Sequence, residues 1–144
     1  MLYFDTSIVA PILLTESTSA RVERWLTGLS TGGLAISQWT YLEILSAIAR
    51  EVRMGRIDTD AAKAADLDFQ DMLASSFDIL QPATEDFETA KLYLRRYDTG
   101  LRGGDALHLA VAANRKADAI YTLDKGMLKA GRALGLPVET GIDT

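Results

Sequence analysis

Short apolar segments alternate with longer amphipathic segments along the chain, and this alternation constrains the fold more than any other feature. Strands are expected over residues 2–4, 34–36, 77–80 and 119–122, with a weaker strand around residues 137–139. Apolar residues at helical spacing predict helices over residues 7–14, 19–29, 39–54, 60–74, 85–97, 105–115 and 125–134. Strands that alternate with helices form a mostly parallel sheet with helices on both faces, joined by right-handed crossovers. The sequence therefore predicts an α/β fold with three layers (α/β/α) and a mostly parallel central sheet of four or five strands.

The length and composition indicate one globular domain. The chain has 144 residues, of which 48% are hydrophobic and 24% are charged, and a chain of this size can bury a core without disulfides or metals to support it. It contains no internal repeat, no low-complexity tract and no linker long enough to divide it. We therefore predict a single domain over residues 1–144.

Residue counts and charge exclude several kinds of chemistry. The chain has no cysteine, so it can form neither a disulfide nor a thiolate metal site. Its one histidine, His108, argues against a zinc site built mainly from histidines. The net charge of −5 argues against binding of nucleic acid through bulk electrostatics. An activity on nucleic acid would need local basic patches, or metal ions that offset the carboxylates.

We expect neither a signal peptide nor a membrane-spanning segment. No basic stretch precedes the first apolar run, and Pro11 and Glu16 soon interrupt that run. No segment approaches the roughly 20 apolar residues that cross a bilayer. The sequence is therefore that expected of a cytoplasmic protein.

Local features within the predicted helices support them. Gly55 and Gly135 follow two of the helices, in the position that glycine commonly takes after a helix end. The helix over residues 39–54 has one apolar stripe with helical spacing, made of Leu42, Leu45, Ile48, Ala49 and Val52.

Four carboxylates stand where predicted strands end or where the following helices begin. Asp5 ends the first strand and Asp124 follows the strand near residue 120. Glu43 lies in the first turns of the helix after the second strand, and Asp105 starts another helix. Because the ends of parallel strands lie along one edge of the sheet, where ligands bind, these four side chains are candidates for one site.

Each of these carboxylates also has a structural interpretation. Aspartate is a preferred residue before a helix, where its charge gains about 0.3–1 kcal/mol from the helix dipole, so capping alone explains Asp5, Asp105 or Asp124. Thr40 and Glu43 have the spacing of a capping box. As a set, however, closely spaced carboxylates raise one another's pKa values and destabilise the fold unless a cation joins them. Mg²⁺ or Mn²⁺ would take such oxygen ligands, activate water and stabilise a phosphoryl group during displacement.

Four motifs in this order give the chain a family resemblance. The segments LYFDTS (residues 2–7), TYLEI (40–44), LRGGDALHLA (101–110) and IYTLD (120–124) resemble those of PIN-domain ribonucleases. The closest resemblance is to the VapC toxins of bacterial and archaeal toxin–antitoxin pairs, and it covers essentially the whole chain. It implies a PIN-like form of the predicted fold.

The resemblance also implies roles for individual residues. Asp5, Glu43, Asp105 and Asp124 would form an acidic quartet around Mg²⁺ or Mn²⁺, with Asp5 and Asp105 as the firmest metal ligands. Ser7, with Thr6 beside it, would support the pocket. The implied activity is metal-dependent endoribonuclease hydrolysis of RNA that leaves a 5′-phosphate and a 3′-hydroxyl. The implied partners are a second copy of the chain in a homodimer and a VapB-like antitoxin that blocks the acidic groove.

Three further side chains have both a functional and a structural interpretation. Arg102 and Lys125 lie beside Asp105 and Asp124 in the sequence and are candidates for contacts with RNA phosphates, although such charges usually mark a solvated helix face. His108, three residues after Asp105, is interpreted as a packing histidine with hydrogen bonds rather than as a metal ligand.

Two other functions fit the same acidic residues. One is a Mg²⁺-dependent phosphotransfer domain, such as a phosphatase or a receiver-like module, although the first strand carries one aspartate rather than the Asp-x-Asp pair of such phosphatases. The other is a non-catalytic PIN-like binding module whose acidic residues only cap helices.

Overall fold

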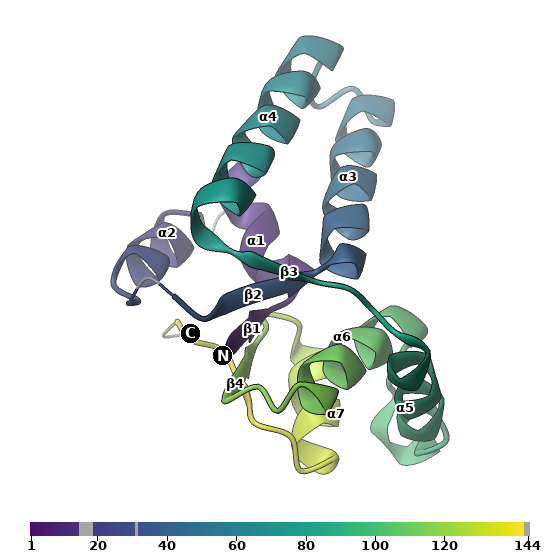
Figure 1. Ribbon diagram of the computed structural model, residues 1–144. Helices are drawn as coiled ribbons and strands as arrows, with labels where there is room; N and C mark the ends of the chain where they lie inside the picture. Colours follow the sequence, from purple (N-terminus) through teal and green to yellow (C-terminus); the bar gives the residue numbers. More distant parts are fainter. Residues whose placement is uncertain (15–18, 31, 143–144) are drawn as a thin grey trace.

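The computed structural model describes residues 1–14, 19–30 and 32–142 (Figure 1). Within these residues, five strands form one sheet in the order β3-β2-β1-β4-β5, and every neighbouring pair is parallel. The strands are β1 (Leu2–Phe4), β2 (Leu34–Ser37), β3 (Asp78–Leu80), β4 (Ala119–Tyr121) and β5 (Val138–Glu139). The predicted three-layer α/β architecture with a central parallel sheet is confirmed.

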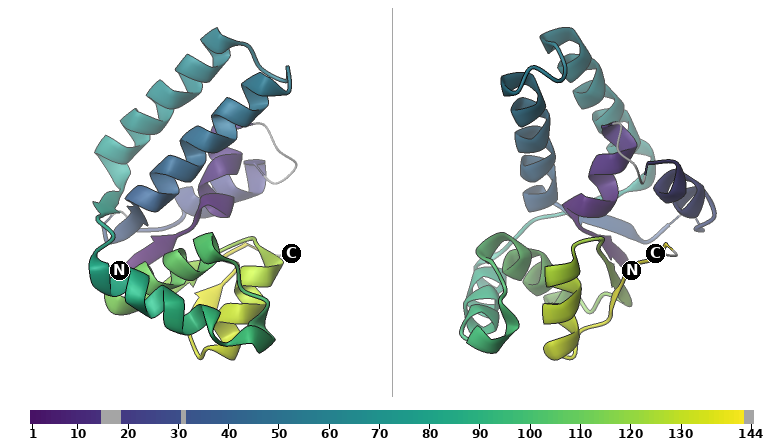
Figure 2. Two further views of the ribbon diagram at one scale, coloured as in Figure 1. Left: turned by 90° about the vertical axis from the view of Figure 1, so that its right-hand side faces the viewer. Right: turned by 180° about the vertical axis from the view of Figure 1, so that it is seen from behind.

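Helices cover both faces of this sheet, as the alternating pattern predicts. On one face lie α1 (Thr6–Leu13), α2 (Ser19–Thr27), α3 (Gln38–Arg53) and α4 (Thr59–Ser76). On the other lie α5 (Thr84–Leu94), α6 (Gly103–Asn114) and α7 (Lys125–Ala133), with the 3-10 helix η1 (Tyr97–Thr99) after α5. The pair α3 and α4 projects well beyond the sheet (Figure 2). In the part of the chain that the structure describes, no helix combines the length and the apolar character needed to cross a membrane.

The core consists of two apolar layers, one on each face of the sheet. Phe4 points into the layer under α1 to α4, where it meets Ile8 and Phe69, whereas Tyr3 points into the opposite layer with Ile120. Successive side chains of a strand face opposite sides of the sheet, so the three residues of β1 serve both layers. This is why β1 is apolar throughout and lies at the centre of the sheet.

Several element boundaries differ from those predicted. The helix expected over residues 85–97 ends at Leu94, and η1 follows it before Gly100, whose backbone φ is 68°. Helix α4 is longer than predicted because the Asp58 side chain accepts a 2.7 Å hydrogen bond from the Ala61 amide and so starts the helix at residue 59. The glycines that were expected after two helices, at positions 55 and 135, have φ of 71° and 74°, as a helix end of this kind requires.

The predicted apolar stripe of α3 matches the buried face only at Ile48. The buried residues are Thr40, Ile44 and Ile48, whereas Leu42 is 58% exposed and Leu45 is 36% exposed. The buried side of α3 packs mainly against α1 and α4. Helix α3 therefore carries apolar residues on two faces, of which one is exposed.

Away from the strand ends, one buried ion pair links α5 to the end of α6. The Asp86 carboxylate is 1% exposed and accepts hydrogen bonds from the Ala83 amide at 2.8 Å and from the Asn114 side chain at 2.9 Å. Arg115 donates to both Asp86 oxygens at 2.9 Å and to the carbonyl oxygen of Gln81 at 2.6 Å. Each hydrogen-bonding position of this buried carboxylate is thus used to hold the two helices together.

We predict that Asp86→Asn lowers the free energy of unfolding by about 1–3 kcal/mol, because Arg115 and Asn114 lose a charged acceptor in a buried place. Burial opposes the charge on Asp86, but its hydrogen bonds from Ala83, Asn114 and Arg115 outweigh this and lower its pKa. The loss should therefore be full at neutral pH and shrink as the pH falls through that lowered pKa. Urea unfolding at several pH values measures it.

The matched control is Asp98→Asn. Asp98 pairs with Arg96 on the surface, where solvent screens the pair, so this substitution should change the stability little. Equal unfolding curves for the two variants would contradict a structural role for the Asp86 ion pair.

Candidate active site

The strand order places the ends of β1 and β4 side by side at the point where the chain reverses its direction across the sheet. From β1 the chain proceeds to β2 and β3 on one side, and it then returns to β4 on the other side of β1. Ligands of parallel α/β sheets bind outside the carboxyl ends of the strands at this point. Asp5 directly follows β1, and Asp124 lies three residues after the end of β4.

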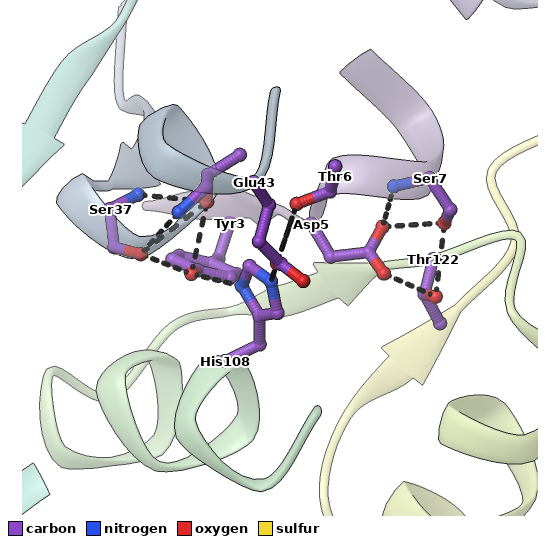
Figure 3. A network of polar contacts seen from close by, with 9 residues as sticks. Tyr3, Asp5, Thr6, Ser7, Ser37, Glu43, His108 and Thr122 are labelled. Atoms are coloured by element: carbon purple, nitrogen blue, oxygen red, sulfur yellow. Dashed lines mark hydrogen bonds and ion pairs between the residues drawn. The ribbon is translucent and has the colours of Figure 1, made fainter. Parts of the chain in front are cut away.

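Asp5 is held by two hydroxyl groups and caps α1 (Figure 3). Its Oδ1 accepts hydrogen bonds from the Ser7 amide at 3.1 Å and the Ser7 hydroxyl at 2.6 Å, and its Oδ2 accepts one from the Thr122 hydroxyl at 2.8 Å. The carboxylate is only 3% exposed, and burial raises the pKa of Asp5 above its ordinary value despite these hydrogen bonds. Ser7 therefore contacts Asp5, as expected, whereas the sequence analysis gave no role to Thr122.

The same two hydroxyl groups join the ends of β1 and β4. The Leu123 amide donates to the Ser7 hydroxyl oxygen at 2.7 Å, and the Asp124 amide donates to the Thr122 hydroxyl oxygen at 3.0 Å. Asp124 in turn caps α7 by accepting a 2.7 Å hydrogen bond from the Met127 amide. The backbone that carries Asp124 is thus tied to the residues that orient Asp5.

Glu43 reaches the site from α3 and is held by Thr6 and His108. The Thr6 hydroxyl donates to Glu43 Oε1 at 2.8 Å, and His108 Nε2 makes a short contact with the same oxygen. Partial burial opposes the charge on Glu43, but the hydrogen bond and charge of His108, together with Thr6, outweigh it and lower the pKa of Glu43. Thr6 therefore contacts Glu43, whereas Ser7 contacts Asp5. Asp5, Glu43, Asp105 and Asp124 are together called the acidic group below.

The capping box expected between Thr40 and Glu43 is wrong. If Thr40 capped the helix, α3 would begin at residue 41. It begins at Gln38 instead, and Ser37 is the residue that precedes it. The Thr40 amide donates to the Ser37 hydroxyl oxygen and the Ser37 amide donates to the Thr40 hydroxyl oxygen, each at 3.2 Å. Glu43 is therefore released from capping and is free to serve the site.

Asp105 lies in the first turn of α6, two residues after the helix begins at Gly103. Burial raises the pKa of Asp105 to about 6, and the charges of Asp124, Asp5 and Glu43 add to this increase while His108 opposes it. No hydrogen bond from a described residue offsets these effects. Asp105 therefore lies within range of the charges of the other three carboxylates that the sequence singles out.

The donor chemistry of this acidic group fits a hard divalent cation. All four side chains offer oxygen, the donor that Mg²⁺ and Mn²⁺ prefer, and a cation would relieve the repulsion that raises the pKa of Asp105. Among residues 1–14, 19–30 and 32–142, no group of three or more His, Asp or Glu side chains is arranged to hold a metal ion as it stands. Mg²⁺ commonly binds one or two carboxylates and keeps several waters.

Arg102 and Lys125 are the basic residues nearest in sequence to Asp105 and Asp124. Arg102 precedes α6 and Lys125 is the first residue of α7, and both side chains are exposed. Within the described residues neither forms an ion pair, so both cationic groups are available beside the acidic group.

The fold and site together define an α/β domain with a carboxylate cluster where the strand order reverses. A family model for the PIN domain matches residues 2–133. The chain belongs to the PIN domain family, as the four sequence motifs indicated.

Named relatives extend this likeness. The chain is 32% identical over 139 residues to "Ribonuclease VapC47" of Mycobacterium tuberculosis (strain CDC 1551 / Oshkosh), covering 94% of this chain and 93% of that protein. It is similar in fold to the crystal structure of Mycobacterium tuberculosis VapC20, which is described as a Sarcin-Ricin loop cleaving toxin, with a TM-score of 0.73, 20% identity and coverage of 94% and 96%. It is also similar to a toxin–antitoxin complex from Klebsiella pneumoniae, with a TM-score of 0.70, 17% identity and coverage of the whole of both chains (100% each).

We predict that Asp105→Asn stabilises the protein at neutral pH in the presence of a chelator. The folded protein keeps a proton on Asp105 up to about pH 6, whereas the unfolded chain releases it near the ordinary value of 3.8. Stability of the wild type therefore falls as the pH rises through this interval, and asparagine removes the loss. Thermal unfolding should show a gain of about 1–3 kcal/mol at neutral pH that vanishes toward pH 4. A variant that is less stable than the wild type at neutral pH would contradict the repulsion inferred here.

Proposed function

We propose that this protein is a divalent-metal-dependent endoribonuclease that acts as the toxin of a toxin–antitoxin pair. Membership of the PIN domain family and 32% identity to a protein named as a ribonuclease support this activity. The single observation that carries the proposal is that the hydroxyl groups of Ser7 and Thr122 join the Asp5 carboxylate to the backbone next to and at Asp124. Asp105, whose pKa is raised first by burial, also lies within range of the charges of Asp124, Asp5 and Glu43. Carboxylates gathered in this way at a strand-end site form a binding place for a cation.

In this proposal Asp5 and Asp105 hold Mg²⁺ or Mn²⁺, and Glu43 and Asp124 complete the catalytic group. When bound, the ion supplies activation of water and stabilisation of charge on the phosphate oxygens. The chain's own side chains orient the acids: Ser7 and Thr122 fix Asp5 through the hydrogen bonds at 2.6 and 2.8 Å. These contacts hold the carboxylate without reorganisation, as a preorganised site requires.

The proposed reaction is hydrolysis of an RNA phosphodiester. Water adds at phosphorus and the bond from phosphorus to the 3′-oxygen breaks, which leaves a 5′-phosphate on one product and a 3′-hydroxyl on the other. Arg102 and Lys125, which are exposed beside the acidic group, would contact the phosphates that flank the scissile bond. Such contacts position a nucleic acid without selecting its sequence.

The proposed partners are a VapB-like antitoxin and a second copy of the chain. The likeness to the Klebsiella pneumoniae toxin–antitoxin complex supports the antitoxin. An acidic site on a chain with a net charge of −5 would attract a basic segment of that partner. Since RNA is the proposed substrate, we also propose that the protein acts in the cytoplasm. We further propose that it forms a homodimer and that residues 1–144 are one domain.

We predict that the purified protein cleaves RNA with Mg²⁺ or Mn²⁺ and that excess chelator abolishes cleavage. Asp5→Asn and Asp105→Asn should each lower the rate by about 100-fold or more, because each removes a charge that would hold the ion. Denaturing gels of a labelled RNA measure the rate. Asp98→Asn, which changes an exposed carboxylate in a surface ion pair, is the control and should cleave at the wild-type rate.

Cleavage that persists in excess chelator would overturn the metal-dependent reaction. Formation of an acyl-phosphate on Asp5 with a small phosphodonor would instead favour the phosphotransfer alternative.

We further predict that Mn²⁺ raises the melting temperature of the wild type. A ligand that binds only the folded state adds about 2.7 kcal/mol at 100 times its dissociation constant. Asp105→Asn should lose this response, whereas Asp98→Asn should keep it. A wild type whose melting temperature is indifferent to Mn²⁺ would indicate the non-catalytic alternative, in which the carboxylates only cap helices.

A further inference from the structure

A chain of buried hydrogen bonds runs from the start of α3 to Glu43 through Tyr3 and His108 (Figure 3). The Tyr3 hydroxyl donates to the Ser37 hydroxyl oxygen at 3.0 Å, and its oxygen lies 2.7 Å from His108 Nδ1. On the other side of the ring, His108 Nε2 contacts Glu43 Oε1. Tyr3 and Ser37 are fully buried and His108 is 1% exposed. The chain therefore connects β1, α3 and α6 inside the core and ends at the acidic group.

The two ring nitrogens of His108 have different partners. A carboxylate can only accept, so the contact with Glu43 requires a hydrogen on Nε2. The Tyr3 oxygen lies 2.7 Å from Nδ1, so both nitrogens of the ring have a polar partner. The hydrogen bond at one imidazole nitrogen determines whether the other nitrogen acts as a donor or as an acceptor.

His108 is the one polar side chain in a buried stretch of α6. Its neighbours on this helix from Ala106 to Ala112 are all buried, and apart from His108 itself they are all apolar. Its ring instead meets polar groups of other elements: the Tyr3 hydroxyl at Nδ1, and Glu43 and the Thr6 hydroxyl at Nε2. Burying a polar side chain without such partners would be costly.

Glu43 needs such a contact to stay in the acidic group. Its side chain is 32% exposed, and its charge acts on Asp105. Fixing a free glutamate side chain costs conformational entropy. Both contacts that hold it, from Thr6 and from His108, are to Oε1, which leaves Oε2 without a partner among the described residues.

We propose that His108, itself held by Tyr3, is a positioning residue that fixes Glu43 through Oε1 and directs Oε2 to the site. The inference rests on the proposed nuclease function. His108 touches neither the substrate nor an ion in this role, and it acts only through Glu43. The Tyr3 hydroxyl is part of the same arrangement, since it contacts Nδ1, the nitrogen of the imidazole ring that does not face Glu43.

The first test is spectroscopic and does not depend on activity. His108 is the one histidine of the chain, so protein labelled with ¹⁵N-histidine gives the signals of a single imidazole. At neutral pH we expect a hydrogen on Nε2 that exchanges slowly with solvent, faster exchange in Glu43→Ala and a shifted Nδ1 signal in Tyr3→Phe. A ring that carries its hydrogen on Nδ1 alone, or signals that neither substitution changes, would overturn the proposal.

The second test separates positioning from packing by kinetics. In RNA cleavage with Mn²⁺, His108→Leu should lower kcat by about tenfold to 100-fold with KM nearly unchanged, the effect expected when a group that orients a catalytic side chain is lost. His108→Gln, whose amide can donate near the position of Nε2, should recover most of the rate. Tyr3→Phe, which removes only a hydroxyl, should lower kcat by about tenfold and serves if His108→Leu does not fold.

The stability control is Asp86→Asn, which weakens the fold away from the acidic group and should keep the wild-type kcat. Unchanged kcat in both His108→Leu and Tyr3→Phe, or His108→Gln no better than His108→Leu, would contradict the proposal. If the wild type cleaves no RNA with any divalent ion, the proposed function fails, and the imidazole spectrum still decides whether His108 holds Glu43.

Discussion

The gathering of negative charge around Asp105, from carboxylates that are distant in sequence, is the constraint on which the site depends. Burial and the charges of Asp124, Asp5 and Glu43 raise the pKa of Asp105 to about 6. Carboxylates that repel one another tend to move apart or to take up protons unless neighbouring groups hold them. The hydroxyl groups of Ser7 and Thr122 hold Asp5 and the ring of His108 contacts Glu43, whereas Asp105 accepts no hydrogen bond from a described residue.

Two of these carboxylates are helix caps and members of the acidic group at the same time. Asp5 accepts from the Ser7 amide at the start of α1, and Asp124 accepts from the Met127 amide at the start of α7. The capping and functional interpretations of the sequence are therefore compatible, because a helix that begins just after a parallel strand has its start at the edge where ligands bind. The start of a helix also favours negative charge, which partly offsets the repulsion.

The layers and the acidic group could be predicted from the sequence because each rests on a local pattern. Apolar runs of three or four residues marked the strands, and the acids that follow them were placed by the geometry of parallel sheets. The polar contacts of Tyr3 and Thr122 could not be predicted, because both residues lie in or beside short apolar strands and their partners are more than 30 residues away, as in the pairs Tyr3–Ser37 and Asp5–Thr122. Apolar spacing also gave the buried face of α3 only in part, since Ile48 is buried but Leu42 and Leu45 are exposed.

The double use of Asp5 limits what can be learned by replacing it. A substitution there alters the first turn of α1 and the link to Thr122 in addition to the charge, so a loss of activity would have more than one cause. Asp105 stands inside the first turn of α6 rather than before it, and no hydrogen bond from a described residue depends on it. If Asp105 has the catalytic role proposed for it, an inert form of the protein that keeps its native shape, as needed for trapping a complex with an uncut substrate, is therefore best engineered at Asp105.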